Sequence, residues 1–151
     1  MGLYHARAKY VPYIWHVVKP LIHKVITNTD DSLIVDDYME MLMKSDVELW
    51  IGLDDEEFSG DFKALTDDDI KMIVVSEVTP LPRTKVLQIL VWCTKSGRDY
   101  QHWMDQFGTI EDYGRDHGCV AVTAIARKGL AKKLHQLSGW KEESILLSKD
   151  L

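Results

Sequence analysis

The chain contains no apolar run long enough to cross a membrane. Its 151 residues include no stretch of about 18 uncharged apolar residues, and the amino terminus lacks a basic segment followed by a short apolar one. Ala6 stands where a myristoylation motif requires Ser or Thr, so a lipid anchor is not supported. These absences predict a soluble, cytoplasmic protein with no membrane partner.

Cysteine is scarce, and the usual metal and nucleotide motifs are absent. Cys93 and Cys119 lie in apolar contexts without metal-ligand spacing, which predicts buried, reduced thiols, while a disulfide between them stays open at this point. His16 and His23 are seven positions apart, but Pro20 between them argues against a preformed metal site. No serine-hydrolase elbow, Walker turn or dinucleotide fingerprint occurs.

Basic residues are outnumbered, 18 Lys and Arg against 24 Asp and Glu, for a net charge of −6. Phosphate contacts require a basic surface, so nucleic acid is excluded as the main partner. One local basic cluster consists of Arg127, Lys128, Lys132 and Lys133. Two interpretations of this cluster stay open: a solvated helix face, or a site for a small anion such as the phosphates of a nucleotide cofactor.

The length and a hydrophobic content of 46% predict a single domain over residues 1–151. Apolar residues recur at three- and four-residue steps from Tyr10 to Thr27, which predicts a helix. Pro20 falls inside it, so we expect a kink or break near Lys19. After a turn at residues 28–32, a second helix is expected over about Val35–Lys44.

The middle of the chain changes to strand patterns. Alternation or β-branched content predicts three strands: Val47–Leu53, Ile70–Thr79 and Thr84–Cys93. Pro80 and Pro82 mark a turn between the last two, which predicts an antiparallel hairpin. Val86–Trp92 is apolar at nearly every position, as in a strand buried on both faces. Residues 58–69 show no clear period and are expected to form a loop or short helix.

The carboxyl-terminal part predicts a crossover unit. A helix from about residue 100 to Asp116, a strand at Cys119–Ile125, a helix at Gly129–Ser138 and a last strand at Glu143–Ser148 are expected. An antiparallel hairpin followed by strand, helix and strand predicts an α/β fold in which a central mixed sheet is flanked by helices.

The segment Ala131–Trp140 resembles the A-x-x-L-Y-x-x-x-G-F element of the GNAT N-acetyltransferases, with His135 where those enzymes usually carry tyrosine. An ordinary amphipathic helix that stops at Gly139 would give the same pattern. The likeness extends over most of the chain, and the chain most resembles small phage-encoded GNAT-like proteins. The segments that carry it are Pro12–Trp15, Leu49–Gly52, Gly118–Cys119, Arg127–Gly129 and Lys149–Leu151.

The resemblance implies a GNAT-like fold that binds acetyl-CoA and transfers the acetyl group to an amine on a small molecule or protein. GNAT enzymes hold the diphosphate with a Q/R-x-x-G-x-G/A turn, and here Thr94 and Asp99 depart from that pattern. An ordinary strand-to-helix turn is the alternative. The cofactor-binding residues implied are Val91, Trp92, Cys93, Lys95, Ser96, Gly97, Arg98, Lys128 and Lys132.

The same resemblance supplies two candidate catalytic residues. Glu77, in a strand expected to face the central cleft, would act as the base through water, although a charged strand residue is commonly solvent-facing. His135 would return a proton to the leaving thiolate. Two functions stay open: a working acyltransferase, or a catalytically silent phage virion or host-interaction protein that self-associates or binds a phage or host partner.

Overall fold

The computed structural model describes residues 2–26, 34–54, 58–95, 100–126, 128–136, 139–143, 147 and 149–151. Its centre is a five-stranded sheet in the order β1-β2-β3-β4-β5. The strands are β1 (Gly2–Ala6), β2 (Glu48–Leu53), β3 (Ile70–Pro80), β4 (Lys85–Thr94) and β5 (Ala121–Ala124). Strands β1 to β4 pair antiparallel and β5 runs parallel to β4, so the sheet is mixed as predicted.

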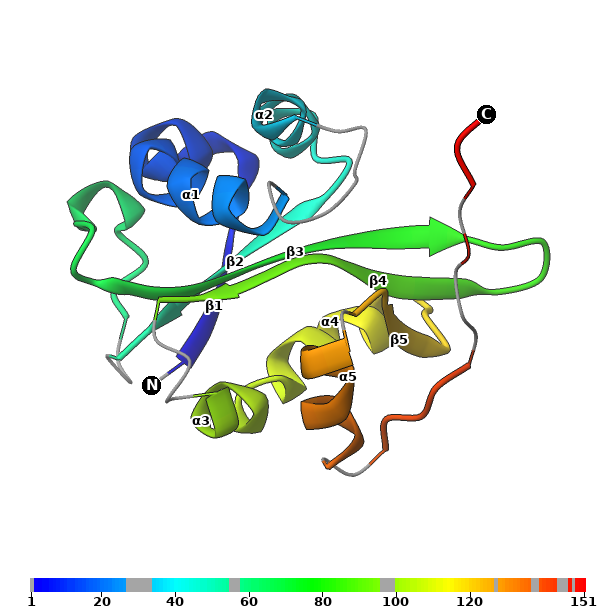
Figure 1. The fold of residues 1–151 in the computed structure, drawn as a ribbon. Coiled ribbons are helices and arrows are strands. Elements are labelled where there is room, and N and C mark those ends of the chain that lie inside the picture. The colour runs from blue at the N-terminus through cyan, green and yellow to red at the C-terminus, as the bar shows by residue number, and fades with distance from the viewer. Residues whose placement is uncertain are drawn as a thin grey trace.

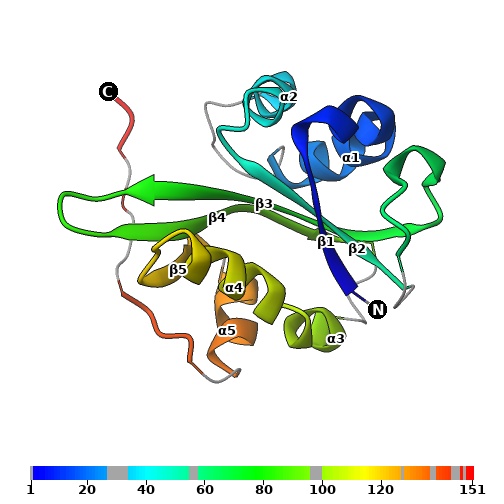
Figure 2. The same cartoon turned by 180° about the vertical axis from the view of Figure 1, so that it is seen from behind.

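Helices cover both faces of this sheet, as Figure 1 shows and the view from behind confirms (Figure 2). One face carries α1 (Val11–Ile26) and α2 (Val35–Met43), and the other carries α3 (Tyr100–Asp105), α4 (Gly108–Asp116) and α5 (Lys128–His135). Two separate clusters of buried apolar residues fill the spaces between sheet and helices. Short 3-10 helices occur at Ala8–Tyr10 and Phe62–Ala64, the second within the segment expected to be a loop or short helix.

Helix α1 continues through Pro20, so of the kink or break expected near Lys19, the break does not occur. Pro20 itself is exposed, while Val18, Leu21 and Ile22 around it are buried against the sheet and α2. Burial of these apolar side chains outweighs the hydrogen bond that the proline removes from the solvent-facing side of the helix.

Two further elements differ from the sequence prediction. Strand β1 was not predicted, and it forms the edge of the sheet by pairing with β2 from Gly2↔Leu53 to Ala6↔Leu49. The helix expected from residue 100 to Asp116 is divided into α3 and α4. Its division lies at Phe107, whose N–H bonds the Met104 carbonyl in a tight i to i−3 turn and whose ring is 2% exposed.

The β3–β4 hairpin forms as predicted, but β4 is not buried uniformly on both faces. The pairing shifts from Val75↔Val91 to Ser76↔Ile89, which leaves Leu90 as an extra, bulged residue. A bulge reverses the alternation of side chains beyond it. Leu87 and Ile89 therefore pack on the α3–α4 side, whereas Val91 and Cys93 pack on the α1–α2 side. Between these buried positions, β4 residues are half-buried.

The carboxyl-terminal strand expected at Glu143–Ser148 lies only partly within the described residues. Glu143 and Leu147 do not lie in a strand, and residues 144–146 and 148 fall outside the described part of the chain. Within the described residues β5 is therefore the second edge of the sheet. The turn expected at residues 28–32 and the end of the helix at 137–138 also lie outside the described residues.

Candidate functional site

Strands β4 and β5 run together for only a short distance. Their pairing begins at Val86↔Ala121 and ends at Ile89↔Ala124, while β4 continues to Thr94. In the described ranges, no strand pairs with the rest of β4 on the side away from β3. Backbone N–H and C=O groups require partners, so this part of β4 offers hydrogen bonds to a ligand that carries amides.

The side chains of this open stretch belong to the core. Val91 and Cys93 are buried beneath α1, and burial raises the pKa of the Cys93 thiol. The Trp92 indole stacks on Phe107, with 5.1 Å between ring centroids and 16° between planes. What these residues present along the strand edge is therefore backbone.

Cys119, expected to be buried, is half-buried, and both cysteines are free thiols.

Lys95 follows β4 and is held in place by the loop before β3. Its backbone N–H donates to the Lys71 carbonyl at 2.9 Å. Its ammonium donates to the Asp67 carboxylate at 3.0 Å and also to the Asp67 carbonyl. The cation expected to meet a diphosphate is thus engaged by a carboxylate. Ser96, Gly97 and Arg98, predicted to complete the anion site, lie outside the described residues.

Glu77 lies in a row of polar residues across three strands. It pairs with Gln88 on β4, which in turn pairs with Thr123 on β5. All three are half-buried, and side chains directly opposite on neighbouring strands lie about 5 Å apart at Cβ. Thr79 follows on the same face of β3, and its hydroxyl is buried without a hydrogen-bond partner in the described part of the chain.

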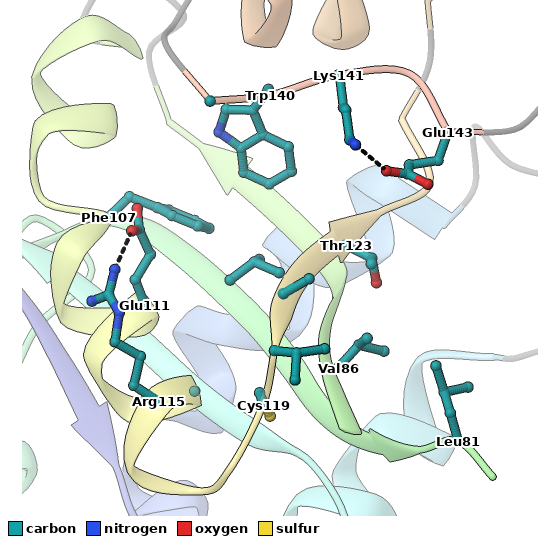
Figure 3. Close-up of a pocket in the computed structure, with 15 residues that line it drawn as sticks. Leu81, Val86, Phe107, Glu111, Arg115, Cys119, Thr123, Trp140, Lys141 and Glu143 are labelled. Carbon is teal, nitrogen blue, oxygen red and sulfur yellow. Dashed lines mark hydrogen bonds and ion pairs between the residues drawn. The ribbon is translucent and has the colours of Figure 1, made fainter. Parts of the chain in front are cut away.

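Sequence reasoning named Glu77 and missed Gln88 and Thr123. The signal that could have found them is strand alternation combined with register, and register requires knowing which residues pair. Thr123 also marks where the row meets a groove (Figure 3).

That groove has a volume of about 660 Å³ and lies between β5, α4 and residues Gly139–Glu143 (Figure 3). Phe107 and Trp140 meet edge to face on its wall, with ring centroids 6.0 Å apart. Two ion pairs flank it: Glu111 with Arg115 at 3.4 Å, and Lys141 with Glu143 at 3.2 Å. The groove therefore combines aromatic and small apolar surface with two ion pairs whose charges are balanced.

The last helix places the remaining candidates on an exposed surface. His135 and Lys132 are exposed on α5, whereas Leu134 between them is 5% exposed and anchors the helix. Lys128 opens α5, and its side chain lies outside what the structure describes. Gly139 has φ +92°, the left-handed region expected for a glycine that follows a helix.

No protein-family model matches the chain, and no curated protein sequence matches it. Several solved structures do match the chain. An aminoglycoside acetyltransferase from an uncultured soil metagenomic sample superposes with a TM-score of 0.69 at 11% identity, covering 99% of this chain and 95% of that one. A ribosomal-protein-alanine N-acetyltransferase from Brucella melitensis biovar Abortus 2308 superposes with a TM-score of 0.64 at 13% identity, covering 99% of both chains.

This chain has the GNAT acetyltransferase fold. A probable acetyltransferase gives the same result, with a TM-score of 0.68 at 13% identity over 100% of this chain and 97% of that one. The open stretch of β4 and the polar row through Glu77 lie within the sheet of this fold. At these identities the likeness establishes the fold alone.

No described helix is long and apolar enough to cross a membrane. Within the same residues, no group of three or more His, Cys, Asp or Glu side chains is placed to hold a metal ion.

Proposed function

We propose that the protein is an acyltransferase that uses acetyl-CoA and transfers the acetyl group to an amine. The observation that carries the proposal is the separation of β4 from β5 beyond Ile89, next to the bulge at Leu90. This separation leaves a stretch of strand backbone without a strand partner within the described ranges, with the polar row of Glu77, Gln88 and Thr123 beside it.

The residues present fit the pantetheine arm of acetyl-CoA well and its diphosphate less well. The backbone of Val91, Trp92 and Cys93 suits the amides of a pantetheine arm, because a strand edge pairs with extended amides. The diphosphate would be bound by Lys95, Ser96, Gly97 and Arg98, and by Lys128 and Lys132 on α5. Of these cations, Lys95 is already paired with Asp67, so anion binding competes with an existing contact.

When bound, acetyl-CoA would supply an activated acetyl thioester. Glu77 would accept a proton from the attacking amine at a carboxylate oxygen, directly or through a water molecule. Gln88 and Thr123, in register with Glu77, would orient the amine by hydrogen bonds. His135 would donate a proton from its imidazole to the thiolate that leaves when the C–N bond forms and the C–S bond breaks. An aminoglycoside acetyltransferase among the structural neighbours acts on an amine-bearing small molecule, which supports a small polyamine-like acceptor for this chain.

The first test is whether acetyl-CoA raises the melting temperature. A ligand present at a hundred times its dissociation constant stabilises the folded state by about 2.7 kcal/mol. For a domain of this size that corresponds to a shift of about 5 °C or more. Adenosine diphosphate probes the diphosphate end alone, and desulfo-CoA, which lacks only the thiol, adds the pantetheine arm, so the difference between them reports on the strand edge. No shift with acetyl-CoA at millimolar concentration would refute the proposal.

A catalytically silent protein that acts by contact with a phage or host protein is the second candidate. It is favoured by the engagement of Lys95 with Asp67 and by Thr94 and Asp99 in place of the usual turn residues. This candidate predicts the same fold with no acetyl-CoA binding. A melting curve unchanged by acetyl-CoA, together with a stable complex in solution, would support it over the enzyme.

A further inference from the structure

Glu48, at the start of β2, has a carboxyl group inside the fold. The residue is 8% exposed, and no Lys or Arg in the described ranges forms an ion pair with it. Two hydroxyl groups bind it instead: Ser76 donates to Oε2 at 2.8 Å, and Tyr113 donates to Oε1 at 3.2 Å. Tyr113 belongs to α4 and Ser76 to β3, so the carboxyl joins the sheet to the helix above it.

The two hydroxyls are not equivalent. The Trp50 indole N–H can only donate, and it donates to Ser76 Oγ at 3.0 Å, so the single Ser76 proton points to Glu48. The Tyr113 hydroxyl can turn and accept a proton instead. When Glu48 is ionised, both hydroxyls donate to it. When Glu48 is neutral, its own O–H can donate to Tyr113 while Ser76 still donates to the other oxygen, so both states have their hydrogen bonds satisfied.

Other titratable groups surround the cluster from two elements. From β1, His5 stacks on Trp50 with centroids 5.0 Å apart and meets Tyr113 edge to face at 5.4 Å. After α4, His117 stacks on Tyr113 at 3.9 Å, and its charge favours ionised Glu48. Cys119 is the remaining titratable neighbour. Burial, followed by the charges of Arg7 and His117, lowers the pKa of His5.

Opposing effects act on the carboxyl itself. Burial raises the pKa of Glu48 above its ordinary value, and the bonds from Ser76 and Tyr113 lower it by less. Burial and then the nearby Glu48 charge raise the pKa of Tyr113 to about 12, so the phenol keeps its proton while Glu48 titrates. Ionisation of Glu48 is therefore less favourable inside the fold, where α4 lies against the carboxyl, than it would be in water.

We propose that Glu48 is a proton switch for the seating of α4: the helix packs firmly on the sheet when the carboxyl is neutral and loosens when it is ionised. Helix α4 also packs on the sheet through Ile110, through the Tyr113 ring against Trp50, and through Gly114 beside Leu87. Glu111, Gly114 and Arg115 of α4 line the groove beside β5, so the state of Glu48 reaches the groove wall. The switch does not depend on the proposed transferase activity.

The sign of the effect follows from proton linkage. Between the pKa of an ordinary Glu and the raised pKa, the folded chain binds more protons than the unfolded chain. The unfolding equilibrium constant therefore decreases as pH is lowered through this window, by up to about tenfold per pH unit. Glu48→Gln cannot titrate and removes this contribution, so wild type should gain stability over Glu48→Gln as pH falls from 8 to 5. Histidine contributions cancel in the comparison, because both proteins keep His5 and His117.

Urea unfolding at each pH measures the effect, with Glu142→Gln as the matched control at an exposed carboxyl. The control should give a curve parallel to wild type. Tyr113→Phe keeps the stacked ring but removes one donor, so it should move the window to higher pH. Curves for wild type and Glu48→Gln that stay parallel from pH 8 to 5 would overturn the proposal.

Two measurements on wild type keep the proposal testable if Glu48→Gln does not fold. The carbon-13 signal of the Glu48 carboxyl should titrate above the pH of an exposed Glu, and a midpoint at or below that value overturns the switch. Amide exchange, corrected for intrinsic rates, should show α4 protected more strongly relative to β3 as pH falls. Equal changes in α4 and β3 would overturn the assignment to α4.

Discussion

The indole of Trp103 lies directly against Gly52: a Cβ placed at position 52 would come within 2.7 Å of Trp103 Cζ3. Met72 closes the other side, with its own Cβ at 2.9 Å from the same point. Trp103 is 1% exposed, so the ring has no free space into which to move. The absence of a side chain on β2 is what lets α3 approach the sheet so closely.

Gly52→Ala should therefore lower the free energy of unfolding by about 1–3 kcal/mol, as overpacking of a filled core does. Gly114→Ala is the matched control. A Cβ there meets Leu87 at 3.4 Å, an ordinary contact, and alanine favours the helix over glycine by about 0.5–1 kcal/mol. Guanidinium unfolding should show opposite signs for the two variants. An unchanged free energy of unfolding in Gly52→Ala would mean that the Trp103 ring can move to make room for the added Cβ.

Pro20→Ala should stabilise the protein. Pro20 lies inside α1 and is exposed, so alanine restores a helical N–H without disturbing packing, for a gain of about 1–2 kcal/mol after the greater freedom of the unfolded chain is counted. Pro12 is the control, because in the first turn its missing N–H has no helical partner. Pro12→Ala should not stabilise. Equal effects in thermal unfolding would contradict this account.

Asp67→Asn should remove the ion pair of Lys95 with little effect on stability, while the ammonium keeps its bond to the backbone carbonyl of residue 67. The pair is partly solvent-exposed, with side-chain exposures of 27% for Lys95 and 75% for Asp67, so its loss should cost less than about 1 kcal/mol. Under the proposed function, acetyl-CoA should bind more tightly to Asp67→Asn and more weakly to Lys95→Ala in calorimetry. Asp68→Asn, at an exposed neighbour, is the control. Identical affinities in all variants would remove Lys95 from the cofactor site.

Glu77→Gln should reduce kcat by about 10²–10⁴ if Glu77 is the base, since that is the usual contribution of a positioned general base. Folding should be unaffected, because Glu77 is half-buried at the hairpin and not part of the core. Glu40→Gln on α2 is the control for a change of surface charge. Steady-state assays with acetyl-CoA and a panel of amines measure the effect. Full activity in Glu77→Gln would exclude it as the base.

His135→Ala should lower turnover if the imidazole is the acid, and His135→Tyr should restore part of it. The pH profile of the Tyr variant should move to higher pH, because phenol and imidazole titrate far apart. His135 is exposed on α5, so neither change should alter the melting temperature. Gln136→Ala, at an exposed neighbour of His135, is the control. Unchanged turnover in His135→Ala would leave the residue without a catalytic role.

Local patterns identified most of the elements. The periodic apolar residues of α1 and α2, the alternation in β2 and the prolines between β3 and β4 predicted these segments close to their observed bounds. Strand β1 was missed because five residues carry too little pattern to be recognised without their partner β2. The division at Phe107 was missed because the ring is drawn into the core beside Trp92, a contact between residues distant in sequence.

The candidate site was less accessible to sequence reasoning. Glu77 could be named from its strand, but Gln88 and Thr123 join it only through pairing across β3, β4 and β5. Lys95 was named for its charge, yet its ion pair with Asp67 spans 28 positions. The bulge at Leu90 has no signature in an apolar run, although it decides which face each β4 side chain occupies.

By itself, the sequence determined the α/β class, the order of the elements from α1 to β4 and the hairpin, because these follow from periodicity and turn residues within short segments. Only the tertiary structure decided that α1 runs through Pro20, that β4 parts from β5 after Ile89, and that Glu48 is buried between Ser76 and Tyr113. The physical reason is common to all three. Burial, strand register and hydrogen bonds between distant residues depend on the chain being folded, and they override local preference where the two conflict.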